Sequence, residues 1–97
     1  MKVQKFARKV FFVDGVEVTK ENLEEVAEWC GGSVKTTTAK PEENLEAQPY
    51  VKVPILKYVN ERQTKAFVGD VVTKSGNQFK VYTASAFRKS FEELVSS

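Results

Sequence analysis

The sequence predicts an α+β fold, in which a strongly curved antiparallel sheet or a small open barrel has two helices packed on it. Residues 20–30 repeat apolar residues at the i, i+3, i+4 and i+7 spacing of a helix with one buried face, and residues 84–94 repeat them at intervals of three and four residues, which also indicates a helix. The other apolar runs are short, rich in Val, Thr and aromatic residues, and separated by Gly, Asn and Pro. Together they predict the element order β-β-α-β-β-β-β-β-α in one domain covering residues 1–97.

The first two predicted strands form a hairpin. Residues 3–13 end in a run of Val and Phe that favours a strand. Asp14-Gly15 is a common hairpin dipeptide because Gly tolerates positive φ, and residues 16–18 then return as a short partner strand.

The first helix is predicted to begin after Thr19, whose hydroxyl can accept a free N–H of the first turn. Gly31-Gly32 supplies the left-handed residue that ends it. Trp29 lies at the border of the apolar stripe and is expected to cover the edge of the core. The stripe itself consists of Leu23, Val26, Ala27 and Cys30.

The middle of the chain is predicted to contain two strands and a loop. Residues 33–39 are rich in Thr and Val and indicate a strand. Residues 40–49 have two prolines and no periodicity, which predicts a mobile loop. Residues 50–59 are predicted as a long strand, with a bulge or bend where the apolar parity shifts at Pro54.

Three short strands and a helix are predicted for the rest of the chain. Turns at residues 60–62, 69–70 and 75–77 separate strands at 63–68, 71–74 and 78–83, which indicates a β-meander. Thr83 or Ser85 is expected to cap the terminal helix, with Arg88 paired to Glu92 at i, i+4. Its buried face consists of Ala84, Phe87, Phe91 and Leu94.

The composition of the sequence excludes most common kinds of catalytic site. It has no histidine and a single cysteine, Cys30, which excludes an intramolecular disulfide, the Ser-His-Asp and Cys-His catalytic pairs and the common zinc sites. Cys30 is expected to be a small buried apolar residue. There is no Gly-rich phosphate loop and no nucleophile elbow. We therefore predict a protein that is not an enzyme and that holds no metal or cofactor.

Two segments carry a resemblance to a known family. They are the helix end Asn22-Leu-Glu-Glu-Val-Ala-Glu-Trp-Cys-Gly-Gly32 and the region from Val68-Gly-Asp-Val-Val to Phe91-Glu92. Together they resemble small phage-encoded accessory proteins with an NLEEIAEWCGG-like helix end, a PGDW-(I/V) turn and a closing F-x-x-x-(F/Y)-E helix. This chain has Val68 where the family often has Pro and Val71 where it often has Trp. The resemblance implies a phage accessory protein in the cytoplasm of the infected host.

Acidic residues on the first helix are one candidate binding surface. They fall on the side opposite the apolar stripe and are Glu21, Glu24, Glu25 and Glu28. Glu24 and Glu28 repel each other at i, i+4 by a few tenths of a kcal/mol, which favours a functional use. A solvated face is the alternative, because acidic residues early in a helix also favour its positive end.

Cations and tyrosines of the second half are the other candidate. Residues 49–97 carry 8 basic and 4 acidic side chains, whereas residues 1–48 carry 7 basic and 9 acidic ones. Cations interleaved with aromatic residues can bind nucleotides or single-stranded nucleic acid, although Lys on strands also protects against edge pairing. The predicted ligand-binding rim comprises Tyr50, Lys52, Lys57, Tyr58, Lys65, Asp70, Lys80 and Tyr82. Gly69-Asp70 is also explained by turn chemistry alone.

These observations favour a binding protein that occupies a host or phage protein stoichiometrically. The alternative is a nucleic-acid or nucleotide binder, including a sink for a signalling nucleotide, although the net charge of +2 is low for nucleic acid. No apolar run approaches the roughly 20 residues of a membrane span, so no membrane association is expected. The oligomeric state is not predicted.

Overall fold

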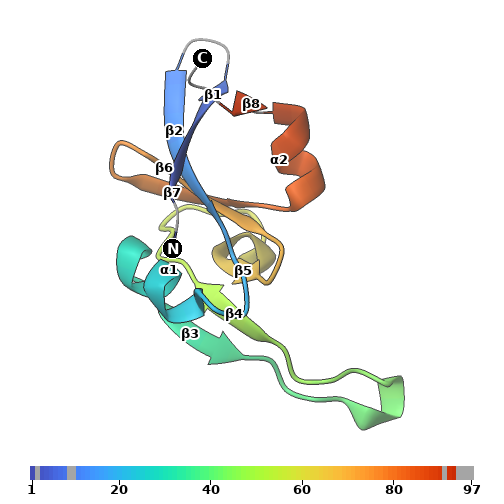
Figure 1. Ribbon diagram of the computed structural model, residues 1–97. Coiled ribbons are helices and arrows are strands. Elements are labelled where there is room, and N and C mark those ends of the chain that lie inside the picture. Colours follow the sequence, from blue (N-terminus) through green and yellow to red (C-terminus); the bar gives the residue numbers. More distant parts are fainter. Residues whose placement is uncertain (2, 9–10, 91, 94–97) are drawn as a thin grey trace.

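The computed structural model describes residues 1, 3–8, 11–90 and 92–93. Within them the chain forms two antiparallel sheets and two α-helices, which confirms the predicted α+β class (Figure 1). The strands form two sheets in place of one continuous sheet, and neither closes into a barrel in the described part. The helix α1 (Leu23–Cys30) packs on the smaller sheet, and α2 (Ala84–Ser90) packs on the larger one.

The larger sheet has the strand order β7-β6-β2-β1-β8, and the smaller has the order β3-β4-β5. The larger sheet contains β1 (Gln4–Arg8), β2 (Phe11–Glu17), β6 (Val71–Ser75), β7 (Gln78–Tyr82) and β8 (Glu92–Glu93). The smaller contains β3 (Ser33–Thr36), β4 (Pro49–Lys52) and β5 (Lys65–Phe67). Two 3₁₀ helices, η1 (Pro41–Glu43) and η2 (Glu61–Thr64), lie in the connections of the smaller sheet.

The dipeptide Asp14-Gly15 lies inside β2, so the hairpin turn predicted there is wrong. β2 pairs with β1 on one side and with β6 on the other, which places Asp14 opposite both Lys5 and Lys74. The Asp14 carboxylate also accepts a hydrogen bond of 2.8 Å from the Lys5 ammonium. Pairing on both sides keeps the chain extended through a dipeptide that would otherwise favour a turn.

α1 begins at Leu23, and Asn22 is its cap residue in place of the predicted Thr19. The Asn22 side chain accepts the backbone N–H of Thr19 at 2.8 Å and donates to the carbonyl of Glu17 at 2.9 Å. These bonds hold a turn where the sequence predicts the first helical turn. The helix ends at Gly31 in the left-handed conformation, as predicted. The predicted stripe faces the core, with Leu23 partly buried and Val26, Ala27 and Cys30 buried.

The core lies where α1 meets both sheets. It includes Val16 and Val72 from the larger sheet and Val51 and Ala66 from the smaller one, together with the buried face of α1. Trp29 packs at its edge against Phe79, with the two ring centroids 5.5 Å apart and the rings nearly perpendicular. The packing role predicted for Trp29 is confirmed.

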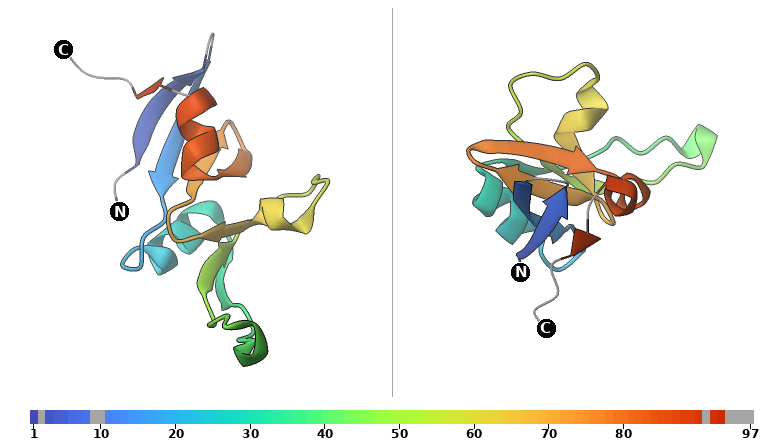
Figure 2. Two further views of the ribbon diagram at one scale, coloured as in Figure 1. Left: turned by 90° about the vertical axis from the view of Figure 1, so that its right-hand side faces the viewer. Right: turned by 90° about the horizontal axis from the view of Figure 1, so that it is seen from above.

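Residues 37–48, which we call the β3–β4 arm, extend away from both sheets (Figures 1 and 2). The Thr37 N–H donates to the carbonyl of Gln48 at 2.9 Å, and Lys40 forms a β-bridge with Leu45. β3 ends at Thr36, earlier than the predicted residue 39. The arm contains most of the predicted loop 40–49, whose mobility stays a prediction.

The long strand predicted at residues 50–59 is wrong beyond Lys52, where β4 ends. The Val53 N–H donates to the carbonyl of Thr64 at 2.8 Å. The Ile55 N–H donates back to the carbonyl of Val53 at 2.9 Å and closes a tight turn around Pro54. Pro54 has no N–H with which to continue the strand pairing. The predicted bend at Pro54 is therefore confirmed, and the chain leaves the sheet at this residue.

The predicted meander is divided between the two sheets, because β5 pairs with β4 while β6 and β7 pair with each other. The turns predicted at residues 69–70 and 75–77 are confirmed, with Gly69 at φ 98° and Gly76 at φ 61°. The residues predicted as a turn at 60–62 begin η2, and β5 starts at Lys65, later than the predicted residue 63.

α2 is capped by Thr83, as one of the two predicted alternatives requires. The Thr83 hydroxyl accepts the N–H of Ala86 at 3.2 Å, and Phe87 is buried. The predicted i, i+4 pair of Arg88 with Glu92 is wrong, because the helix ends at Ser90 and Glu92 belongs to β8. Glu92 pairs with Ala7 of β1, so the backbone is extended at the position where the sequence predicts a further turn of helix. The predicted core residues Phe91 and Leu94 lie outside the described residues.

Candidate functional site

The segment from residue 53 to residue 60, which we call the Pro54 loop, projects from the smaller sheet together with η2 (Figure 2). Its first end is held by the turn around Pro54. Its second end is held by a capping box, in which the Asn60 side chain accepts the N–H of Arg62 at 2.8 Å. Reciprocally, Gln63 Oε1 accepts the N–H groups of Val59 and Asn60 at 2.9 and 3.2 Å. The backbone is therefore fixed at both ends of an exposed loop.

The Pro54 loop exposes apolar side chains between these two fixed ends. Leu56 and Val59 are each 98% exposed, and Tyr58 is 49% exposed. Full exposure of two large aliphatic side chains within four residues is unfavourable in water unless another surface covers them. We call Leu56, Tyr58 and Val59 the loop patch. The sequence did not indicate Leu56 and Val59 as exposed binding residues, because its pattern predicts a long strand through both.

A cavity of about 250 Å³ lies between the Pro54 loop and β7, and we call it the tyrosine hollow. It brings together four of the eight predicted rim residues from two separate segments, Lys57 and Tyr58 from the loop and Lys80 and Tyr82 from β7. Ile55, Gln63 and Val81 complete the lining. Gln63 also lines the hollow and was not among the predicted rim residues. The three-residue spacing of Asn60 and Gln63, which is typical of a capping box, is the sequence feature that could have indicated it.

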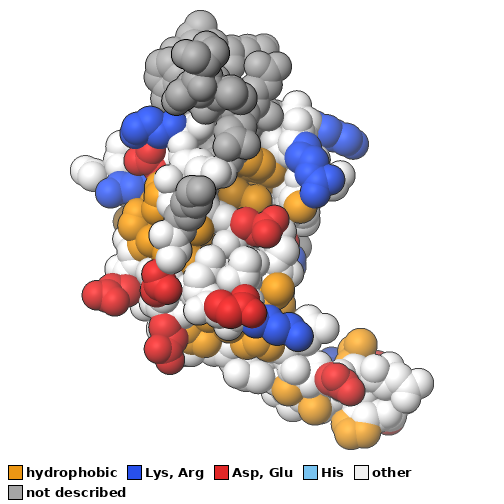
Figure 3. All heavy atoms as spheres, in the orientation of Figure 1, with side chains coloured by type: hydrophobic (Ala, Val, Ile, Leu, Met, Phe, Trp, Pro, Cys, Tyr) orange, Lys and Arg blue, Asp and Glu red, His pale blue; other side chains and the backbone are white. Residues whose placement is uncertain are grey.

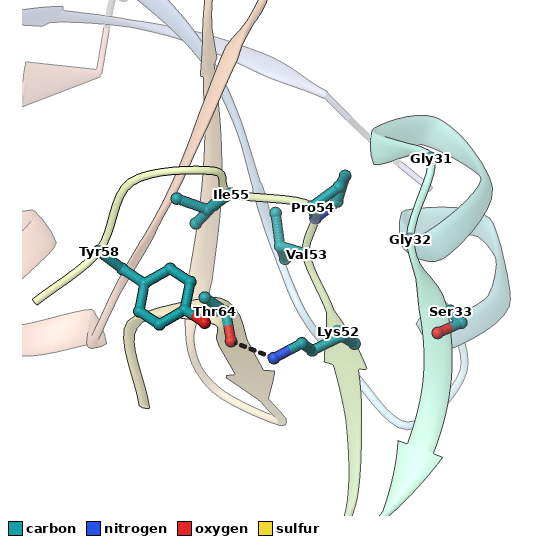
Figure 4. Close-up of a pocket in the computed structure, with 9 residues that line it drawn as sticks. All are labelled: Gly31, Gly32, Ser33, Lys52, Val53, Pro54, Ile55, Tyr58 and Thr64. Carbon is teal, nitrogen blue, oxygen red and sulfur yellow. Dashed lines mark hydrogen bonds between the residues drawn. The ribbon is translucent and has the colours of Figure 1, made fainter. Parts of the chain in front are cut away.

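A second cavity of about 410 Å³ adjoins the tyrosine hollow and shares Ile55 and Tyr58 with it (Figure 4). Its far wall consists of Gly31, Gly32 and Ser33 at the end of α1. Lys52 reaches across this cavity and donates to the Thr64 hydroxyl at 2.7 Å, with Glu61 at 3.6 Å. The charge of this predicted rim residue is thus already engaged by neighbouring groups of the chain.

The remaining predicted rim residues, Tyr50, Lys65 and Asp70, lie elsewhere and line neither cavity. Tyr50 is buried, with its ring centroid 5.1 Å from that of Phe67 and the Lys65 ammonium 5.5 Å above its ring. Asp70 is only 8% exposed. Its carboxylate accepts hydrogen bonds from the Arg62 guanidinium at 2.9 Å and from the backbone N–H of Phe67 at 3.0 Å. The contacts of Asp70 are those of a turn residue, as the alternative reading of Gly69-Asp70 requires.

The four predicted acidic residues, Glu21, Glu24, Glu25 and Glu28, are all exposed. Glu21 lies in the turn before α1, and the other three lie on the helix itself. Acidic side chains gather over α1 in the space-filling view (Figure 3). Glu25 accepts a hydrogen bond of 2.8 Å from the Met1 ammonium. Glu21, Glu24 and Glu25 line a depression that also includes Lys20, Leu23 and Val34 and shares no residue with the tyrosine hollow, whereas Glu28 does not line it.

Cys30 is buried at the end of α1. Burial raises the pKa of its thiol, and hydrogen bonds from the backbone of Gly32 and of Cys30 itself lower it only in part. A thiol with a raised pKa is a poor nucleophile at neutral pH. Within residues 1, 3–8, 11–90 and 92–93, His, Cys, Asp and Glu side chains form no group of three that could hold a metal ion.

Comparisons with protein-family models, with curated proteins and with solved structures find no match to this chain. In the part of the chain that the structure describes, neither helix has the length and apolar character of a membrane span.

Proposed function

We propose that this protein is a phage-type accessory protein that binds a host or phage protein stoichiometrically, without catalysis, in the cytoplasm of the infected host. The resemblance of residues 22–32 and 68–92 to small phage accessory proteins supports the phage origin. The partner docks on the loop patch, formed by Leu56, Tyr58 and Val59. This surface replaces the acidic helix face that the sequence favours as the docking surface.

The observation that carries the proposal is the full exposure of Leu56 and Val59 on a loop that is fixed at both ends. A partner that covers these side chains removes their apolar surface from water, which favours binding. A fixed loop also loses little conformational entropy when a partner covers it, which favours affinity. The loop patch therefore combines apolar area with a backbone that is already ordered.

The acidic face has a different part in this proposal. Exposed carboxylates contribute little to affinity, but a surface rich in acidic side chains speeds the encounter with a basic partner. That contribution is screened over about 8 Å at physiological ionic strength. Glu24 and Glu28 thus affect the rate of association more than the lifetime of the complex.

Affinity capture from infected cells tests the proposal with two matched double variants. Leu56→Ser with Val59→Ser should abolish capture of the partner, because it removes the apolar anchors. Glu24→Lys with Glu28→Lys should retain capture but slow association, as measured with the purified partner. Val68→Ser changes another exposed apolar residue, 43% exposed, outside the loop and serves as the control. If the Leu56→Ser, Val59→Ser protein captured the partner as well as the unchanged protein does, the loop patch would not be the docking surface.

A further inference from the structure

The tyrosine hollow contains two ammonium groups that the described part of the chain leaves without a partner. Lys57 and Lys80 both line it, and neither takes part in an ion pair or a hydrogen bond with a described residue. Lys52, in the adjoining cavity, is by contrast engaged by Thr64 and Glu61. Two unengaged cations at one cavity favour a ligand with an anionic group.

Apart from Gln63, the rest of the lining is aliphatic or aromatic. Ile55 and Val81 are partly buried and pack against the core, so they form a fixed floor. Tyr58 and Tyr82 enter from the loop and from β7, and the Tyr82 ring is held by Phe87, with centroids 6.1 Å apart. Small-molecule sites combine apolar and aromatic lining with a few placed polar groups. Tyrosine rings beside such a floor favour a planar aromatic ligand.

Gln63 adds a directed hydrogen-bond donor. Its Oε1 atom is occupied by the N–H groups of Val59 and Asn60, and this fixes the orientation of the amide. Its Nε2 atom has no partner among the described residues. A primary amide held in this way can donate to a ring carbonyl of a ligand in the hollow.

We propose that the tyrosine hollow binds a nucleoside monophosphate. The phosphate lies at Lys57 and Lys80, the base packs against Tyr58 and Tyr82, and Gln63 Nε2 donates to a carbonyl of the base. The volume of about 250 Å³ lies below the roughly 300–1,000 Å³ usual for small-molecule sites, so it limits the ligand to a single nucleotide at most. A single strand of nucleic acid would require stacking platforms repeated along a groove.

Isothermal titration calorimetry of the purified full chain tests this site with UMP, GMP, AMP and CMP, and with inorganic phosphate. We expect saturable binding of the nucleotides, weakest for AMP because adenine is the one base of the four without a ring carbonyl to accept from Gln63 Nε2. Lys57→Gln with Lys80→Gln should weaken binding by about tenfold or more, because it removes both charge-assisted bonds to the phosphate. Tyr82→Leu should weaken nucleotide binding without changing the response to phosphate. Lys74→Gln, a lysine of the same sheet outside the hollow, is the control.

Three results would overturn the proposal: no saturable heat with any nucleotide, equal affinity for nucleotides and inorganic phosphate, or much tighter binding of single-stranded oligonucleotides that increases with their length. The last two would indicate a general anion site and a strand-binding surface respectively. Melting temperatures of the lysine variants should match the unchanged protein, because both side chains are exposed. The titration uses no protein partner, so its failure leaves the proposed docking function untouched.

Discussion

The carboxylate of Asp70 accepts a hydrogen bond from the guanidinium of Arg62 at 2.9 Å, and this contact ties the β5–β6 turn to η2. The same oxygen accepts the N–H of Phe67, and Arg62 also packs over the Phe67 ring, 4.7 Å from its centroid. η2 in turn holds the end of the Pro54 loop through Gln63. The position of the loop therefore depends on a contact outside it.

Asp70→Ala should destabilise the protein by about 1–3 kcal/mol, because it leaves the N–H of Phe67 and the guanidinium of Arg62 without their acceptor. Urea denaturation followed by circular dichroism measures the change. Asp14→Ala is the matched control, since Asp14 forms an exposed ion pair with Lys5 and such pairs contribute about 1 kcal/mol or less. An equal decrease in the free energy of unfolding for the two variants would show that the buried contacts of Asp70 contribute no more to stability than the exposed ion pair of Asp14.

Gly32→Ala should destabilise the protein by about 3 kcal/mol, the upper part of the range for overpacking a closed site. A Cβ atom at this position would overlap the carbonyl oxygen of Lys52 on the neighbouring strand β4, and backbone cannot move aside cheaply. Gly31→Ala meets no atom within 4 Å and suffers only from φ +74°, which costs about 1–2 kcal/mol. Thermal melting of the two variants should rank Gly32→Ala as the less stable. The reverse order would contradict the close approach of α1 and β4.

The features that the sequence predicts correctly are those set by local patterns. The stripe through Val26 and Cys30 repeats at the helical period, and Gly31 and Gly69 are needed for positive φ. Thr83 caps α2 through a bond within one turn. Each of these depends on residues a few positions apart, so the pattern in the sequence already contains the interaction.

The features that the sequence does not predict depend on partners far along the chain. Asp14-Gly15 reads as a turn until β6 pairs with it across more than fifty residues of sequence. Leu56 and Val59 are predicted as strand residues, because the local pattern indicates a bend at Pro54 but not that the chain leaves the sheet after β4 and exposes them. The tyrosine hollow requires Tyr58 and Lys80 from segments whose relative position follows from the two-sheet arrangement. The sequence therefore predicts which residue types bind the ligand, but it predicts only some of the residues that lie together at the site.

Cys30 should react slowly with a thiol reagent in the folded protein and rapidly once the chain is unfolded in guanidinium. Burial keeps the reagent away and raises the pKa of the thiol above its usual value of 9.0, so little thiolate is present at neutral pH. The folded chain thus binds this proton more tightly than the unfolded chain. The contribution of the Cys30 thiol to the free energy of unfolding is therefore complete below pH 9.0, and it falls as the pH rises through the pKa of the thiol in the folded protein. A fast reaction in the native protein at pH 7 would place Cys30 at the surface.

The β3–β4 arm should be the first part of the chain cut by a Glu-specific protease. It presents Glu42, Glu43 and Glu46 on an exposed segment outside both sheets, where local opening costs little free energy. Mass spectrometry of the first fragments locates the cut. The glutamates of α1 are the internal comparison, because they are equally exposed but lie on a hydrogen-bonded helix. First cuts within residues 21–28 would make α1 the more mobile element.

Val26→Ala should cost more stability than Leu23→Ala, although leucine loses the larger side chain. Val26 is fully buried at 0% exposure, so its truncation removes packing and leaves a cavity, at a cost of about 2 kcal/mol. Leu23 is only partly buried, and water can fill the space that it leaves, which limits the loss to about 1 kcal/mol. Glu25→Ala, on the exposed side of the same helix, should change the free energy of unfolding by no more than about 0.5 kcal/mol. Denaturant titration of the three variants measures the order of the losses, and a larger loss for Leu23→Ala would mean that α1 is rotated about its axis so that Leu23, in place of Val26, faces the core.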